Sequence, residues 1–179
     1  EQGCPTLVIT NAPSSPLAKA ADWIIDIQAG EEKAVAATKT YTGELMAIAM
    51  LSVAMQSNQS LRQYLEKIPT WLDQILGLDY SIGRIAERYR YMEHCVVLGR
   101  GYNYATAFEW SLKMKELCYV VAEPYSSADF QHGPVAMVES GFPVMGILHK
   151  GLVYQDMVQM VKRLKEVHHA EVLIISDEE

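Results

Sequence analysis

The chain has 179 residues, of which 50% are hydrophobic and 21% charged, and its formal net charge is −7 at pH 7. This composition excludes a disordered segment and a disulfide-rich scaffold, and the length is enough for one sizeable core or for parts of two. An acidic chain is also a poor partner for nucleic acid, because contacts to phosphate need clustered lysine and arginine.

The opening segment alternates short strands with turns. Thr6–Thr10 is a β-branched run that predicts a fully buried strand, and Trp23–Gln28 predicts a second strand. Between them, Ser15 can cap a short helix whose first residue is Pro16. The chain begins without Met just before the first strand, so we expect earlier residues to belong to the same protein.

Three helices are predicted next, with no strand between them. Apolar residues recur at helical spacing in Ala36–Asn58, Gln59–Leu78 and Ser81–Glu93. Pro69 lies inside the second of these and predicts a kink or a break. Such a run of helices is typical of a linker between two lobes that each contain a sheet. The longest apolar run, Leu45–Ala54, is too short to span a bilayer, so no membrane association is expected.

Predicted strands and helices then alternate along the chain again. A buried strand is predicted at His94–Leu98, and further strands at Phe142–His149 and Glu171–Ser176. Helices are predicted at Tyr102–Val121 and Val153–Ala170, and a polar loop at Glu123–Pro134. Near-continuous apolar strands that alternate with helices predict a parallel sheet covered on both faces. The chain stops directly after the last strand, where a further helix is expected.

Three cysteines, Cys4, Cys95 and Cys118, lie far apart and lack CxxC spacing. Such a scattered, odd set is typical of reduced thiols in a cytoplasmic protein, and we expect all three to be buried. No set of His, Cys and carboxylate side chains has the spacing of metal ligands, so no metal site is predicted.

The turn Gly99-Arg100-Gly101 stands between a predicted strand and a predicted helix, which is the place of a phosphate-binding loop. It lacks the full GxGxxG pattern, since residue 104 is Tyr. An anion-binding loop and an ordinary tight turn are both open interpretations.

Acidic and basic side chains gather on the helix that follows this turn. Glu109 and Lys113 have the spacing of an ordinary ion pair on a helix face. Residues 117–121 are apolar on every side, however, so we expect this helix end to be buried. Glu116 would then lie at the edge of a dry region, where a carboxylate is a candidate for proton transfer.

His132 lies in the predicted polar loop, and Gly133-Pro134 restricts the backbone directly after it. A histidine held on such a loop takes part in catalysis more often than a histidine on a helix face. The remaining four histidines border strands or end a helix, and we expect them to be structural or exposed.

Several motifs in the right order resemble those of the sugar isomerase (SIS) domain family. They are Leu98-Gly-Arg-Gly, Ala107-Phe-Glu-Trp-Ser-Leu-Lys-Met-Lys-Glu-Leu-Cys-Tyr, Ala122-Glu-Pro-Tyr, His132-Gly-Pro and, upstream, Glu32-Lys-Ala-Val-Ala-Ala-Thr-Lys-Thr-Tyr. Within the family, the resemblance is to the isomerase half of glucosamine-6-phosphate synthases and to aminosugar-phosphate deaminases. It implies an α/β fold, the three-layer α/β/α SIS sandwich with a parallel sheet, present as parts of two tandem lobes. Residues 1–57 would end the first lobe, 58–93 would form a helical linker, and 94–179 would form most of the second lobe.

The resemblance also implies the site residues. The family's catalytic glutamate falls on Glu116, its assisting lysine on Lys113 and its catalytic histidine on His132. Val35 and Ala37 would lie beside the sugar phosphate. The synthases usually have Ser at the position of Ala37, and they often have Lys just before the histidine, where this chain has Gln131. The family's phosphate loops and C-terminal tail would lie outside this chain.

The implied activity is that of a phosphosugar aldose–ketose isomerase acting on fructose 6-phosphate or glucosamine 6-phosphate, coupled to amination or deamination. The resemblance implies a homodimer whose subunits share each active site. No metal or organic cofactor is required, because a carboxylate base, a histidine and a nearby cation suffice to move a proton between adjacent carbons. The alternative is a non-catalytic SIS module that binds a sugar phosphate. The joint presence of Glu116 and His132 favours the enzyme.

Overall fold

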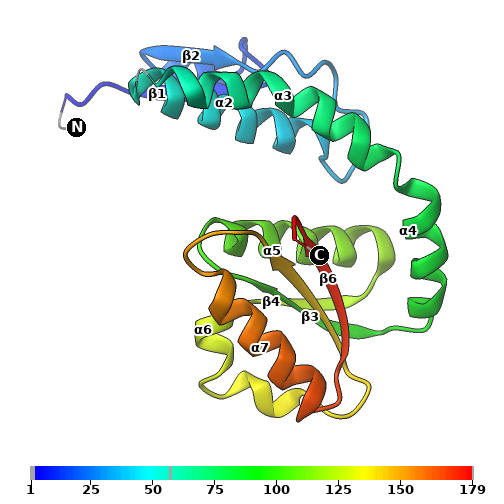
Figure 1. The fold of residues 1–179 in the computed structure, drawn as a ribbon. Helices are drawn as coiled ribbons and strands as arrows, with labels where there is room; N and C mark the ends of the chain where they lie inside the picture. Colours follow the sequence, from blue (N-terminus) through cyan, green and yellow to red (C-terminus); the bar gives the residue numbers. More distant parts are fainter. Residues whose placement is uncertain (1–2, 57, 179) are drawn as a thin grey trace. The chain divides into compact units, whose positions relative to one another are not determined.

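The computed structural model describes residues 3–56 and 58–178. The chain divides into two compact units, Glu1–Ile85 and Ala86–Glu179, called unit 1 and unit 2 below (Figure 1). Unit 1 holds a pair of strands and several helices, whereas unit 2 holds a four-stranded sheet. Within the two described ranges, no helix combines the length and apolar character needed to cross a membrane.

Unit 1 begins with two parallel strands, β1 (Leu7–Thr10) and β2 (Trp23–Asp26). The crossover between them contains the short helix α1 (Pro16–Ala20). As predicted, the Ser15 hydroxyl caps this helix by accepting a hydrogen bond from the Ala18 N–H at 3.2 Å. The local turn chemistry therefore sets where α1 begins.

The prediction that the first strand is fully buried is wrong. Leu7 in β1 and Trp23 in β2 are 44% and 59% exposed. Among the described residues, each of these strands pairs only with the other. A two-stranded sheet has too little area to cover both of its faces, so its apolar side chains remain partly open to solvent.

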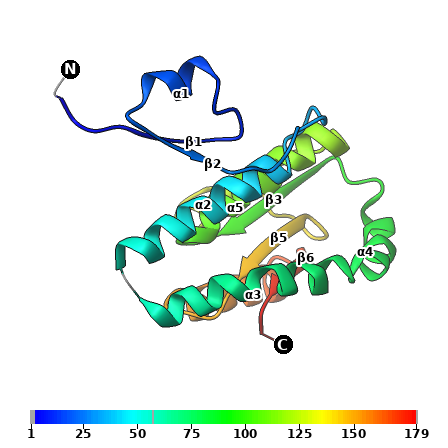
Figure 2. The same ribbon diagram turned by 90° about the horizontal axis from the view of Figure 1, so that it is seen from above.

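Three helices follow the strands, as Figure 2 shows from above: α2 (Lys39–Gln56), α3 (Gln59–Leu76) and α4 (Asp79–Ala86). The Asn58 side chain caps α3 by accepting from the N–H groups of Ser60 and Leu61. α3 continues through Pro69 as a single helix. The helix predicted at Ser81–Glu93 is wrong in extent, because α4 is followed only by a 3₁₀ turn, Glu87–Tyr89.

Unit 2 is built on four parallel strands in the order β4-β3-β5-β6. Their bounds are β3 (His94–Gly99), β4 (Val121–Ser126), β5 (Pro143–Leu148) and β6 (Glu171–Ser176). The central pair, β3 and β5, is almost wholly buried. This confirms the predicted parallel sheet.

Helices cover both faces of this sheet, which makes three layers (Figure 1). On one face, α5 (Tyr102–Lys113) packs its Ala107 against Cys95 and Val97 of β3. On the other face, α6 (Ser127–Phe130) and α7 (Tyr154–Glu166) pack against Val96 and Leu98. Successive side chains of β3 thus point to opposite apolar cores, as the two-residue period of a strand requires.

The helix predicted at Tyr102–Val121 ends earlier than expected. α5 passes into one π-helical turn, Met114–Cys118, and Tyr119 then adopts a left-handed backbone with φ 57°. Leu117 and Tyr119 are 60% and 89% exposed. The expected buried end of the helix is therefore wrong.

The polar loop predicted at Glu123–Pro134 is also wrong in its first part, which belongs to β4. The Glu-Pro pair hides the strand pattern, but among residues 3–56 and 58–178 β4 is an edge strand that pairs with β3 alone. An edge strand tolerates proline because one of its sides needs no hydrogen-bond donor.

All three cysteines are free, as expected, but only Cys95 is buried, whereas Cys4 and Cys118 are exposed. Burial raises the pKa of the Cys95 thiol to about 11. The expectation of three buried thiols is thus wrong for two of them.

Candidate active site

The turn between β3 and α5 is shaped by close backbone packing. A Cβ atom on Gly99 would lie only 2.0 Å from the backbone oxygen of Asn103, so no larger residue fits without displacing α5. The Asn103 side chain in turn lies 2.8 Å from Nδ1 of His149, which follows β5. The neighbouring Arg100 forms an ion pair with Asp156 at 3.4 Å. These contacts favour the tight-turn interpretation of Gly99-Arg100-Gly101.

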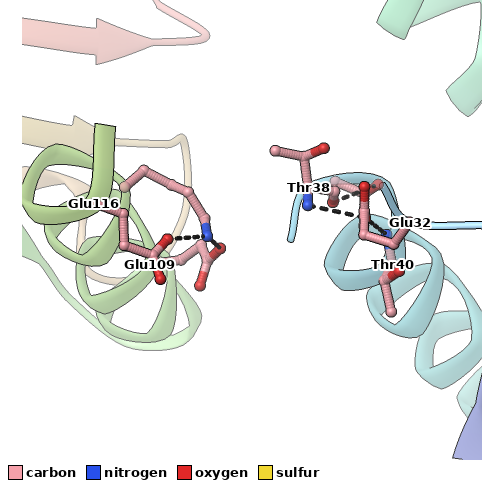
Figure 3. A network of polar contacts seen from close by, with 7 residues as sticks. Glu32, Thr38, Thr40, Glu109 and Glu116 are labelled. Atoms are coloured by element: carbon pink, nitrogen blue, oxygen red, sulfur yellow. Dashed lines mark hydrogen bonds and ion pairs between the residues drawn. The ribbon is translucent and has the colours of Figure 1, made fainter. Parts of the chain in front are cut away.

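The structure brings Lys113 and Glu116 together at the end of α5. The Lys113 ammonium donates a hydrogen bond to Glu116 Oε2 at 2.8 Å and lies 3.3 Å from Glu109 Oε1 (Figure 3). The hydrogen bond to Glu116 is the largest cause that raises the pKa of Lys113 above its usual range. The lysine therefore carries its positive charge at neutral pH.

The Glu116 carboxylate is open to solvent on one side, because its side chain is 35% exposed while those of Lys113 and Glu109 are 20% exposed. The apolar surroundings expected for Glu116 are absent. The Lys113 ammonium lies beside the carboxylate instead. A carboxylate that a ligand can reach, with an ammonium fixed beside it, can accept a proton and stabilise a developing negative charge.

His132 lies elsewhere in unit 2. It is exposed, and its backbone N–H donates to Asp129 O at 3.0 Å, just after α6. Phe130 of α6 packs in the core on the α7 side of the sheet, whereas Ala107 of α5 packs on the opposite side. The sheet therefore separates His132 from Glu116 of the same chain.

The two residues also lie toward different ends of β4. Glu116 precedes Val121, which pairs with the first residue of β3, whereas His132 follows Ser126, which pairs with its last. Six residues of strand span about 20 Å. The structure thus joins only two of the three predicted catalytic residues within one chain.

Val35 and Ala37, the predicted substrate contacts, lie in unit 1 between β2 and α2. Val35 is fully exposed, and Ala36 beside it is buried. Glu32 Oε2 accepts the N–H groups of Thr38 and Thr40, each at 3.1 Å (Figure 3). Sequence reasoning missed this contact, because no helical or strand period connects Glu32 with Thr38 and Thr40.

The residues that the structure describes contain no group of three or more His, Cys, Asp or Glu side chains that could hold a metal ion.

The sequence profile of the SIS domain matches residues 1–54 and 89–179, and the chain belongs to this family. The predicted SIS fold is thereby confirmed. The chain is 34% identical over 165 residues to glutamine–fructose-6-phosphate aminotransferase (isomerizing) of Aquifex aeolicus, which covers 92% of the chain. It is 35% identical over 183 residues to the protein of the same name from Methanosarcina acetivorans, which covers 97% of the chain.

A solved structure agrees with these relatives. The C-terminal domain of glucosamine-fructose-6-phosphate aminotransferase from Francisella tularensis superimposes with a TM-score of 0.87 at 28% identity, over 96% of this chain and 51% of that one. The chain spans only 28% and 29% of the length of the two curated relatives. It therefore corresponds to a part of such proteins and belongs to a family of sugar-phosphate isomerases.

Proposed function

We propose that this chain carries the proton-transfer residues of a phosphosugar aldose–ketose isomerase. Its substrate would be fructose 6-phosphate or glucosamine 6-phosphate, with isomerisation coupled to amination or deamination. The observation that supports this best is the 2.8 Å contact between Lys113 and an accessible Glu116, at the positions of the SIS catalytic lysine and glutamate.

The chemistry follows from these two groups. In the open-chain sugar, Glu116 removes a proton from the carbon beside the carbonyl or imine and returns it to the neighbouring carbon. Between these steps the electron pair moves onto the carbonyl oxygen or the imine nitrogen, which takes up a proton to give the enediol or enolamine, and the Lys113 ammonium stabilises the charge that develops on oxygen. The hydroxyl of the first carbon loses its proton as that carbon becomes the new carbonyl. In the aminating direction, ammonia first replaces the carbonyl oxygen as an imine, with loss of water.

His132 would open the sugar ring, because an imidazole can move a proton between the ring oxygen and the anomeric hydroxyl near neutral pH. Since the sheet separates His132 from Glu116 within one chain, we propose that each active site combines Glu116 of one subunit with the histidine of its partner. The protein would then be a homodimer whose two sites are equivalent by symmetry.

The first test measures isomerisation by the full-length protein with Glu116→Gln. Loss of the general base is expected to lower turnover about 10²-fold or more. Glu123→Gln is the matched control, because Glu123 is also an exposed carboxylate paired with a lysine, at 3.6 Å from Lys115. Near-normal turnover of the Glu116 variant contradicts the proposal. Sugar-phosphate binding by a wild-type protein that shows no turnover would instead indicate the non-catalytic module.

The shared site has its own test. Glu116→Gln chains and His132→Ala chains are unfolded, mixed in equal amounts and refolded. Half of the dimers should be hybrids, and each hybrid has one intact site if the two residues come from different subunits, so activity recovers to about a quarter of wild type. If both residues of a site come from the same chain, the mixture stays inactive.

A further inference from the structure

A single side chain, that of Glu32, connects the beginning of the segment that leads into α2 with its end. α2 begins at Lys39, and the first N–H groups of a helix have no partner within it. Glu32 Oε2 accepts one of them, the Thr40 N–H, and also the N–H of Thr38, which directly precedes the helix. The carboxylate thereby joins the two ends of a loop that contains Val35 and Ala37.

The negative charge of Glu32 strengthens its contact with the start of α2. A negative group at a helix N-terminus interacts favourably with the helix dipole. The hydrogen bond from the Thr40 backbone, followed by that from Thr38, lowers the pKa of Glu32 below its usual range. The side chain is therefore ionised at neutral pH. Because Glu32 already uses these N–H groups, they are not free to bind the substrate's phosphate.

Within the loop, the buried residue Ala36 is an apolar anchor, which means that its side chain packs inside the protein. Ala36 is 5% exposed, whereas its neighbour Val35 is fully exposed. A ligand at Val35 thus meets a backbone whose course depends on the Ala36 anchor and on the Glu32 contact. Removing the carboxylate would free two backbone donors and release the end of the loop at α2.

From this arrangement we propose that Glu32 is a positioning residue, which holds Val35 and Ala37 in place to contact the sugar phosphate. The inference rests on the proposed function, because it takes these two residues as the substrate contact. Glu32 itself touches no reacting atom in this scheme, so it should affect binding of the substrate more than the chemical step.

The experiment compares Glu32→Ala and Glu32→Gln in the full-length protein, measuring kcat and KM for fructose 6-phosphate. Glu32→Ala is expected to raise KM about tenfold, in the range that loss of a helix cap produces, and to change kcat less than about twofold. Glu32→Gln keeps an oxygen that can accept both N–H groups, so its KM should stay within about threefold of wild type.

Asp22→Ala is the matched control. Asp22 is a carboxylate of unit 1 that also accepts two hydrogen bonds, from the Thr6 N–H at 2.7 Å and from the Thr6 hydroxyl at 2.9 Å. It lies outside the 32–40 loop, so this variant should leave KM unchanged. If Asp22→Ala raises KM as much as Glu32→Ala does, or if Glu32→Ala retains the wild-type KM, the positioning role is wrong.

Calorimetric binding of fructose 6-phosphate separates this inference from the proposed function. A wild-type protein that binds the sugar phosphate without turning it over refutes the isomerase. Tenfold weaker binding by Glu32→Ala would still support the positioning role in that case. Equal binding by Glu32→Ala and wild type would overturn it, whatever the activity.

Discussion

Gly99 occupies a position at the end of β3 where the backbone of α5 fills the space of a side chain. Its missing Cβ would lie 2.0 Å from the Asn103 oxygen and 2.9 Å from the Tyr104 nitrogen. Ordinary contact begins near 3.4 Å, so Gly99→Ala requires the first turn of α5 to move by about 1.4 Å. Backbone atoms cannot rotate away as a flexible side chain could.

The cost of this movement is at the upper end of the range for overpacking, about 3 kcal/mol or more, because α5 packs on β3 and leads to Lys113 and Glu116. In a cooperatively unfolding domain of about 150–250 residues, that corresponds to a melting temperature lower by about 6–12 °C. Displacement of α5 should also lower isomerase turnover, since catalytic groups tolerate little misplacement.

The assay is thermal unfolding of the full-length protein, followed by circular dichroism, together with turnover of the folded variant. Gly83→Ala is the control: Gly83 lies in α4 with open space around its missing Cβ, so alanine should stabilise that helix by about 1 kcal/mol. A melting temperature for Gly99→Ala within about 2 °C of wild type would refute the packing argument.

Three further outcomes are expected. In the native protein at about pH 8, a thiol reagent should label Cys4 and Cys118 but not Cys95, whose burial raises its pKa to about 11; native labelling of all three would contradict this. Lys113→Met should lower the urea midpoint by an amount that is constant from neutral pH up to the unfolded-state pKa of 10.5 and vanishes as the pH rises through the raised folded-state pKa. A difference already lost near pH 8 would show that the ion pairs do not act as described. Pro69→Ala should raise the urea midpoint, because proline inside a helix removes a hydrogen bond and costs about 3 kcal/mol; an unchanged midpoint would mean that α3 has already relaxed around the ring.

Local patterns were enough to predict the central strands and several helix starts. β6 has the predicted bounds, Glu171–Ser176, because its run of aliphatic and β-branched residues favours a strand. Ser15 and Pro16 begin α1 as predicted, since capping depends on neighbouring residues only. The spacing of Glu109, Lys113 and Glu116 likewise places them together on one helix side.

Contacts between distant segments decided the rest. β4 is a strand because β3 offers it hydrogen bonds. Its Glu-Pro pair is tolerated because, in the part of the chain that the structure describes, β4 lies at the edge of the sheet. Glu32 acts on α2 through N–H groups six and eight residues away, which no helical or strand period connects.

The clearest case is the pair Glu116 and His132. The sequence by itself determined that a carboxylate, a lysine and a loop histidine of the right chemical types are present, because residue type and local spacing are properties of the chain. Only the tertiary structure decided that the histidine lies across the sheet from that glutamate. The physical reason is the packing of α5 and α6 on opposite faces, which depends on where each strand joins the sheet and not on separation along the chain.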